Sequence, residues 1–169
     1  SAPAAGDLRT AQDGAVRVVT PILRPDMDAA DRTEALRALL DRALPTGGDV
    51  DVAWYYSPMM LAISRHLQPD VTVYDCMDEL SAFLHAPAEL RALEAELMDR
   101  ADLVFTGGLS LFDARKNRHP SVHCFPSSID REHFGRARRP QPDPEAQAYI
   151  PHPRVGFFGV IDERMDLDL

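Results

Sequence analysis

Apolar β-rich runs alternate with helical patterns through the middle of the chain, and this alternation limits the possible folds more than any other feature. Val71-Thr-Val-Tyr74 is one such run, and its β-branched and aromatic residues suit a pleated surface. Crossovers between parallel strands need a dozen or more residues, which the intervening helical stretches supply. The sequence therefore predicts a Rossmann-like, doubly wound α/β fold with a mostly parallel sheet. Strands are expected to begin at residues 50, 71, 102 and 122, and helices are expected over 59–67, 79–84, 88–101 and 109–118.

A β-hairpin is expected before the first of these strands. The extended runs 8–10 and 16–20 flank Asp13-Gly14, a pair that favours a tight hairpin turn. Pro21 and Pro25 end the extended run. A helix is then predicted over 28–44, because its apolar residues recur at helical spacing.

The composition is that of a globular segment with one core: 169 residues, 45% hydrophobic and 27% charged. The formal net charge of −9 argues against nucleic acid as a partner, since phosphate binding requires a basic surface. No run approaches the roughly 20 apolar residues that span a bilayer. Cys76 and Cys124 suit reduced core thiols, and the histidines show no metal-ligand spacing, so neither a metal nor a cofactor is predicted.

Basic residues are concentrated between residues 115 and 139, where only Asp130 and Glu132 are acidic. This segment could contact phosphate groups of a ligand or the surface of an anionic membrane, or it could be a solvated helix face and linker. Its basic residues are Arg115, Lys116, Arg118, Arg131, Arg136, Arg138 and Arg139.

Each predicted strand is followed by groups that can contact a polar ligand. Because the carboxyl ends of parallel strands meet at one edge of the sheet, these groups predict a crevice there. Aromatic rings beside carboxylates and hydroxyls suit a sugar, since rings cover its apolar face and acids accept bonds from its hydroxyls. The candidate residues are Tyr56, Ser57, Asp75, Asp78, Glu79, Thr106, Gly107, Gly108, Ser127 and Ser128.

Some of these candidates also have a structural interpretation. Asp78 or Glu79 could cap a helix that begins at Leu80, with or without a ligand contact. Gly107-Gly108 could expose backbone N–H groups to an anion or a hydroxyl, or could form a tight turn that needs positive φ. No nucleophile elbow, P-loop or GxGxxG motif occurs, so no catalytic residue is predicted.

The end of the chain differs in composition from the rest. Prolines punctuate a polar stretch over 140–153, which predicts a linker between a domain at 1–139 and a further segment at 154–169. Residues 154–161 are predicted to form a buried strand. Such a strand must add to the first sheet, pair with another copy of the chain, or begin a second domain.

Three motifs resemble retaining GT-B glycosyltransferases of the large family four group. Pro126-Ser-Ser-Ile-Asp130-Arg-Glu-His-Phe134 is similar to the "NGVDxxxF" element that closes their N-terminal domain. Gly156-Phe-Phe-Gly159, followed by Glu163-Arg164, resembles the first strand and loop of their nucleotide-sugar domain, although Val160 replaces the usual arginine. The runs 74–79 and 101–108 resemble a bacterial subset that builds cell-surface polysaccharide.

This resemblance implies the acceptor-side domain of an enzyme that transfers a sugar from a nucleotide-sugar donor to a cell-envelope glycan or a lipid-linked acceptor. The enzyme would be cytoplasmic or peripheral at the inner membrane face. The strand-end candidates would face the acceptor, and Gly159 and Arg164 would contact the donor diphosphate. The glycine-rich first strand and the paired-glutamate donor motif of such enzymes do not occur in this sequence, so the chain alone is expected to be inactive. The alternative is a noncatalytic binding or assembly module of a larger sugar-nucleotide pathway protein, related to galactopyranose mutase.

Overall fold

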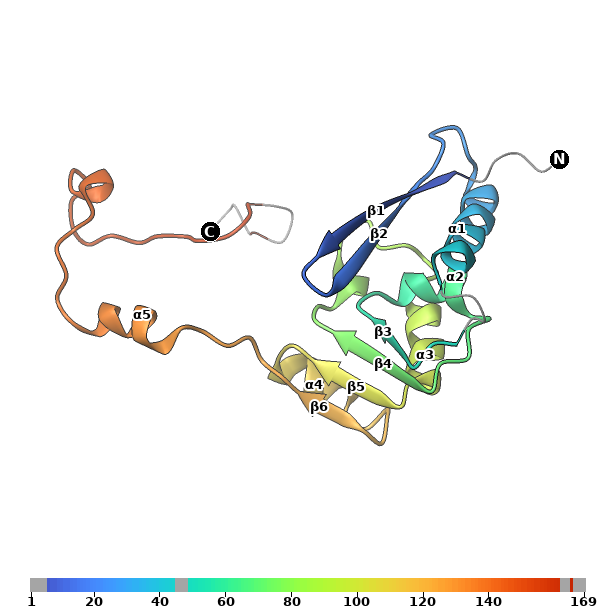
Figure 1. Cartoon of the computed structure of the whole chain (residues 1–169). Helices are drawn as coiled ribbons and strands as arrows, with labels where there is room; N and C mark the ends of the chain where they lie inside the picture. The colour runs from blue at the N-terminus through green and yellow to red at the C-terminus, as the bar shows by residue number, and fades with distance from the viewer. Residues whose placement is uncertain (1–5, 45–48, 162–164, 166–169) are drawn as a thin grey trace. The chain divides into compact units, whose positions relative to one another are not determined.

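Four parallel strands form the central sheet of the computed structural model, which describes residues 6–44, 49–161 and 165 (Figure 1). The strand order is β3-β4-β5-β6, so each strand lies beside the one before it in sequence. The α/β class, the Rossmann-like parallel sheet and the N-terminal hairpin are confirmed. The four strands are β3 (Val52–Tyr55), β4 (Val71–Cys76), β5 (Leu103–Thr106) and β6 (Val122–Cys124).

The connecting helices pack on one face of this sheet. They are α2 (Leu61–Ser64), α3 (Leu90–Arg100) and α4 (Leu109–Arg115). Because side chains alternate along a strand, only every second strand residue reaches these helices, and the register keeps Tyr55, Tyr74 and Val104 on the same side. The resulting core contains Tyr55, Leu61, Tyr74, Cys76, Leu93, Leu97, Met98, Ala101 and Val104. Trp54, Asp75 and Phe105 consequently belong to the opposite face.

The hairpin and the first helix precede the sheet. Strands β1 (Asp7–Asp13) and β2 (Val16–Ile22) pair in an antiparallel register that leaves Gly14 and Ala15 in the turn. Gly14 has a φ of 56°, which a two-residue hairpin turn requires at its first position. Helix α1 (Ala29–Ala43) begins where the Asp28 carboxylate accepts a hydrogen bond from the Asp31 N–H. It packs on α2 through its buried face.

Two predicted helices form wholly or partly as 3₁₀ turns. The segment expected to be helical over 79–84 forms only one 3₁₀ turn, η2 (Leu80–Ala82), because Pro87 follows closely and a short helix does not recover its nucleation cost. The segment expected over 59–67 consists of a 3₁₀ turn, η1 (Pro58–Met60), followed by α2.

The chain divides into two units after Pro126. This division lies before residue 140, where the sequence suggests that the linker begins. The second unit contains α5 (Arg131–Gly135) and the 3₁₀ turns η3 (Arg136–Arg138) and η4 (Glu145–Gln147). Within the second unit, an ion pair of 2.9 Å between Arg154 and Asp143 joins the two ends of the proline-rich segment. That hydrogen-bonded guanidinium lowers the pKa of Asp143.

The predicted strand at 154–161 is wrong for the single chain. These residues are irregular, and their apolar side chains are open to solvent: Val155 and Phe158 are 100% and 103% exposed. A lone strand has no partner for its backbone N–H and C=O groups, so the apolar pattern alone does not hold it extended in a sheet. Pairing of this segment with a second copy of the chain stays a prediction.

Candidate functional site

The carboxyl ends of β4, β5 and β6 lie side by side, as the sequence predicts. The register aligns Cys76 with Thr106 and Thr106 with Cys124. Two backbone hydrogen bonds extend this alignment beyond the strands, from Gly107 N–H to the Cys76 carbonyl (3.0 Å) and from Phe125 N–H to the Thr106 carbonyl (2.8 Å). In parallel α/β sheets this edge is where ligands bind, so it defines the candidate site.

Aromatic side chains collect at this edge on the sheet face opposite to the helices. The ring of Trp54 lies 5.3 Å from that of Phe105 and 6.5 Å from that of Tyr56, and the rings of Phe105 and Phe125 are 5.1 Å apart. Three of these four side chains are about half-exposed or more: Trp54 (48%), Tyr56 (66%) and Phe125 (60%). We call Trp54, Tyr56, Phe105 and Phe125 the aromatic surface.

Asp75 lies beside the aromatic surface. Its Oδ2 accepts a hydrogen bond of 3.1 Å from the indole N–H of Trp54, which fixes the orientation of the indole ring. Asp75 is largely buried, and no second hydrogen bond or ion pair of its carboxylate occurs within the described ranges. The arrangement combines exposed ring faces with one oriented carboxylate, a combination that suits a ligand with both apolar and hydroxyl-bearing surfaces.

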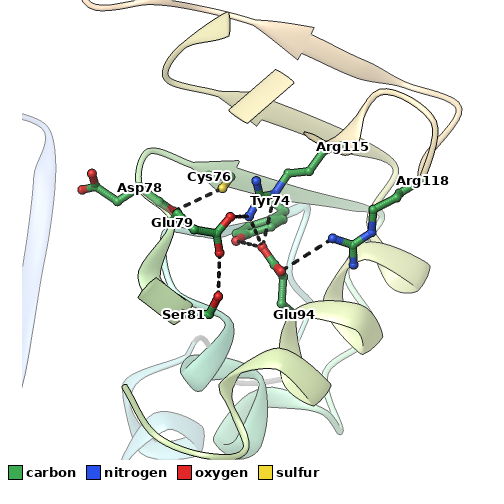
Figure 2. Close-up of polar contacts among 8 residues, drawn as sticks. All are labelled: Tyr74, Cys76, Asp78, Glu79, Ser81, Glu94, Arg115 and Arg118. Atoms are coloured by element: carbon green, nitrogen blue, oxygen red, sulfur yellow. Dashed lines mark hydrogen bonds and ion pairs between the residues drawn. The ribbon is translucent and has the colours of Figure 1, made fainter. Parts of the chain in front are cut away.

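Glu79 points to the other side of the sheet, where its side chain, 44% exposed, contacts a group of largely buried polar side chains (Figure 2). Arg115 Nη2 lies 2.9 Å from Glu79 Oε2 and 2.6 Å from Glu94 Oε1. The same Glu94 oxygen accepts a hydrogen bond of 3.0 Å from the Tyr74 hydroxyl. We call Tyr74, Glu79, Glu94 and Arg115 the Arg115 network. It ties the loop after β4 to α3 and α4.

The protonation states in the Arg115 network are fixed by burial and pairing. Burial alone would lower the pKa of Arg115, but the hydrogen bonds that it donates to Glu94 and Glu79 outweigh burial and raise this pKa. Burial works in the opposite direction on Glu79, yet hydrogen bonds from Ser81 and Arg115 leave the pKa of Glu79 lowered. Burial raises the pKa of the Tyr74 hydroxyl. Arg115 and Glu79 therefore stay charged and Tyr74 stays neutral near pH 7, so the network is suited to holding a loop in place.

In the sequence, Arg115 is only one of several basic residues between 115 and 139. In the structure its side chain is 1% exposed. A signal did exist in the spacing of α4, because Leu111 and Arg115 are four residues apart on one helical turn and Leu111 packs on the core. The Nη1 atom of Arg115 is buried and has no hydrogen-bond partner among the described residues, which adds to the cost of burying this charge.

The remaining predicted residues do not converge on one crevice. Asp78 is exposed and points away from the Arg115 network (Figure 2). The Ser57 hydroxyl caps the turn η1 by accepting a hydrogen bond from Met59 N–H, and Thr106 is fully buried with its hydroxyl bonded to the His123 carbonyl. Glu79 occupies the N-cap position of η2 but makes no side-chain cap bond there, so the capping interpretation of Glu79 is wrong.

The other candidates lie in the second unit or outside the described residues. Ser127 and Ser128 are exposed and belong to the second unit. Gly159, proposed as a donor contact, is exposed and has a φ of 156°. Arg164 lies outside the described residues.

Gly107 and Gly108 differ in their surroundings. Neither has positive φ, so the tight-turn interpretation is wrong. A Cβ atom on Gly107 would lie 3.1–3.3 Å from side-chain and backbone atoms of Met77, whereas a Cβ atom on Gly108 would meet nothing within 4 Å. The close approach of the loops after β4 and β5 therefore favours glycine at 107.

We expect Gly107→Ala to lower the free energy of unfolding by about 1 kcal/mol, because Met77 must shift to admit the new methyl group. Gly156→Ala, at an exposed glycine whose added Cβ atom would meet nothing within 4 Å, is the control and should change stability by less than about 0.5 kcal/mol. Urea denaturation followed by circular dichroism measures both. Equal losses for the two variants would show that the contact with Met77 does not determine the residue at 107.

Comparisons of this chain with protein-family models, with curated proteins and with solved structures find no match. Within the described ranges, no helix is both long enough and apolar enough to cross a membrane. The same residues contain no group of three or more His, Cys, Asp or Glu side chains placed to hold a metal ion.

Proposed function

We propose that this chain is the sugar-binding, acceptor-side domain of a glycosyltransferase that uses a nucleotide-sugar donor and a glycan or lipid-linked acceptor. The aromatic surface with Asp75 is the observation that carries the proposal. It stands at the ligand-binding edge of a parallel sheet, and its four rings belong to three different strands or strand ends, β3, β5 and β6.

The chemistry of a pyranose matches this surface. One face of the ring presents C–H groups that pack against an aromatic side chain, while the hydroxyls at its rim need hydrogen-bond acceptors and donors. Trp54 and Phe125 supply exposed ring area, and the carboxylate of Asp75 supplies the acceptor. Few polar contacts are available, so the affinity for one sugar unit should be weak, with a Kd on the order of 1 mM.

A titration observed at Trp54 tests the proposal directly. Trp54 is the one tryptophan of the chain, so its indole N–H gives a single, unambiguous peak in a ¹⁵N-labelled sample. We expect neutral oligosaccharides to shift this peak saturably at millimolar concentration, and nucleoside diphosphates to leave it unchanged. The absence of any shift with a panel of oligosaccharides at about 10 mM would refute the proposal.

A pair of variants separates binding at the aromatic surface from unspecific effects. Phe125→Ser removes one exposed ring of the surface and should weaken oligosaccharide binding about fivefold, the loss of roughly 1 kcal/mol of ring contact. Val18→Ser removes an exposed apolar side chain of the hairpin and should leave the affinity unchanged. Equal affinities for the two variants would place the sugar elsewhere.

A further inference from the structure

The basic residues between 115 and 139 separate into two groups with different surroundings. Three of them are paired in the first unit: Arg115 within its network, Lys116 with Asp113 at 2.6 Å, and Arg118 with Glu94 at 3.8 Å. The other four lie in the second unit, and none forms an ion pair with a described residue. These four are Arg131, Arg136, Arg138 and Arg139.

The four arginines of the second unit lie in and directly after a short helix that also exposes apolar side chains. Arg131, Phe134 and Arg138 recur at a helical spacing of three and four residues along α5 and η3, so they share one face. Together with Ile129 and Gly135 they line a hollow of about 200 Å³. Ile129 is 67% exposed and Phe134 is 58% exposed. Two large apolar side chains therefore stand in solvent between guanidinium groups.

Little negative charge offsets these arginines. The carboxylate of Asp130 accepts the N-cap hydrogen bond from His133 N–H at 2.9 Å, so it is directed at the helix start. Glu132 lies with Arg136 and Arg139 around a second, open hollow of about 810 Å³. Residues 131–139 hence carry four positive charges against one negative charge, with histidine counted as neutral.

We propose that residues 129–139 form a surface that binds an anionic phospholipid bilayer. Ile129 and Phe134 would enter the boundary between headgroups and acyl chains, while the arginines contact lipid phosphates. Each arginine near an anionic bilayer strengthens binding by about 1 kcal/mol, or about fivefold. The net charge of −9 does not prevent this, because charges farther than about 8 Å from the lipid are screened at physiological salt.

The exposed apolar pair favours a bilayer over nucleic acid. A polyphosphate backbone would account for the arginines but leaves Ile129 without a favourable environment, and the acidic remainder of the chain disfavours a long polyanion. The proposal rests on the second unit alone and is independent of the sugar-binding role proposed for the aromatic surface.

Flotation of the full 169-residue chain with lipid vesicles tests the proposal. We expect binding to vesicles of phosphatidylcholine mixed with phosphatidylglycerol, little binding to phosphatidylcholine alone, and weakening as salt is raised. Arg131→Gln with Arg138→Gln should reduce partitioning about 25-fold, fivefold for each charge. The matched control, Arg37→Gln with Arg91→Gln, removes the same charge from exposed positions of the first unit and should leave partitioning within about twofold.

Apolar insertion is tested separately from charge. Phe134→Ser should reduce partitioning about fivefold or more, since a large apolar side chain no longer enters the bilayer. Tyr149→Ser, at a position of the same unit that is 82% exposed, is its control. The proposal is overturned by equal binding to neutral vesicles, by no binding at all, by equal losses in the two double variants, or by binding of an RNA oligonucleotide in place of vesicles.

Discussion

Replacing Arg115 by methionine is expected to lower the free energy of unfolding by about 3–5 kcal/mol, because Glu94 would keep a largely buried negative charge without its main partner. Arg115 and Glu94 are 2.6 Å apart, with side chains only 1% and 12% exposed. Methionine fills much of the volume, so the loss reports the charge more than the packing. Urea denaturation at pH 7, followed by circular dichroism, measures it.

Arg65→Met is the control for this prediction. Arg65 pairs with Glu96 through two hydrogen bonds of 2.6 and 2.7 Å, so its geometry is as good as that of Arg115. Both side chains are substantially exposed, however, and exposed pairs contribute about 0–1 kcal/mol. A similar loss for Arg65→Met and Arg115→Met would show that burial is not what makes the Arg115 network important.

A double variant separates the lost pair from the stranded charge. Arg115→Met combined with Glu94→Gln removes the carboxylate that has lost its closest partner, so it should recover a large part of the stability lost in Arg115→Met alone. Glutamine still accepts the hydrogen bond of the Tyr74 hydroxyl, which keeps that buried donor satisfied. No recovery would indicate that Arg115 acts mainly through Glu79 and the loop after β4.

Periodicity explains why the sheet and the hairpin could be predicted. The run at Val71 has strand propensity, and its neighbours at 50, 102 and 122 are separated by helical stretches, which restricts them to parallel pairing. The Asp13-Gly14 pair identified the hairpin because only a few residues tolerate the positive φ of its turn. Strand propensity, segment spacing and turn residues depend on neighbours in the sequence, so they can be predicted from the sequence alone.

The direction of each polar side chain could not be predicted in the same way. Asp75 and Glu79 are four residues apart and follow one strand, so the sequence placed them in one crevice. In the structure the pleat sends Asp75 towards Trp54 on one face, and the turn after β4 sends Glu79 towards Arg115 on the other. The partner that decides each direction is distant in sequence, by 21 residues for Asp75 and 36 for Glu79.

The apolar segment at 154–161 shows a second limit of prediction from the sequence. Its pattern matches a buried strand, but burial needs a surface to pack on, and the strand pattern does not specify that surface. The same limit applies to the basic run 115–139, where composition alone could not show that Arg115 is buried in a network and Arg131 is free of ion pairs with described residues.

Leu97→Ala is expected to lower the free energy of unfolding by about 2–5 kcal/mol. Leu97 is fully buried in α3 and belongs to the core under the sheet with Tyr74 and Val104. The cavity cannot close easily, because the Tyr74 hydroxyl is held by Glu94 of the same helix and collapse would break that hydrogen bond. The variant should therefore fall in the upper half of this range.

Leu84→Ala, at a position that is 68% exposed, is the matched control and should change stability by less than about 0.5 kcal/mol. The peak of Trp54 adds a second measurement, because Trp54 lies on the face of the sheet opposite to Leu97. If the sheet is one rigid layer, Leu97→Ala should shift this peak only slightly while the protein remains folded. A loss below about 1 kcal/mol would mean that α3 does not form the main core, and the aromatic surface would then lack the rigid support that selective sugar binding needs.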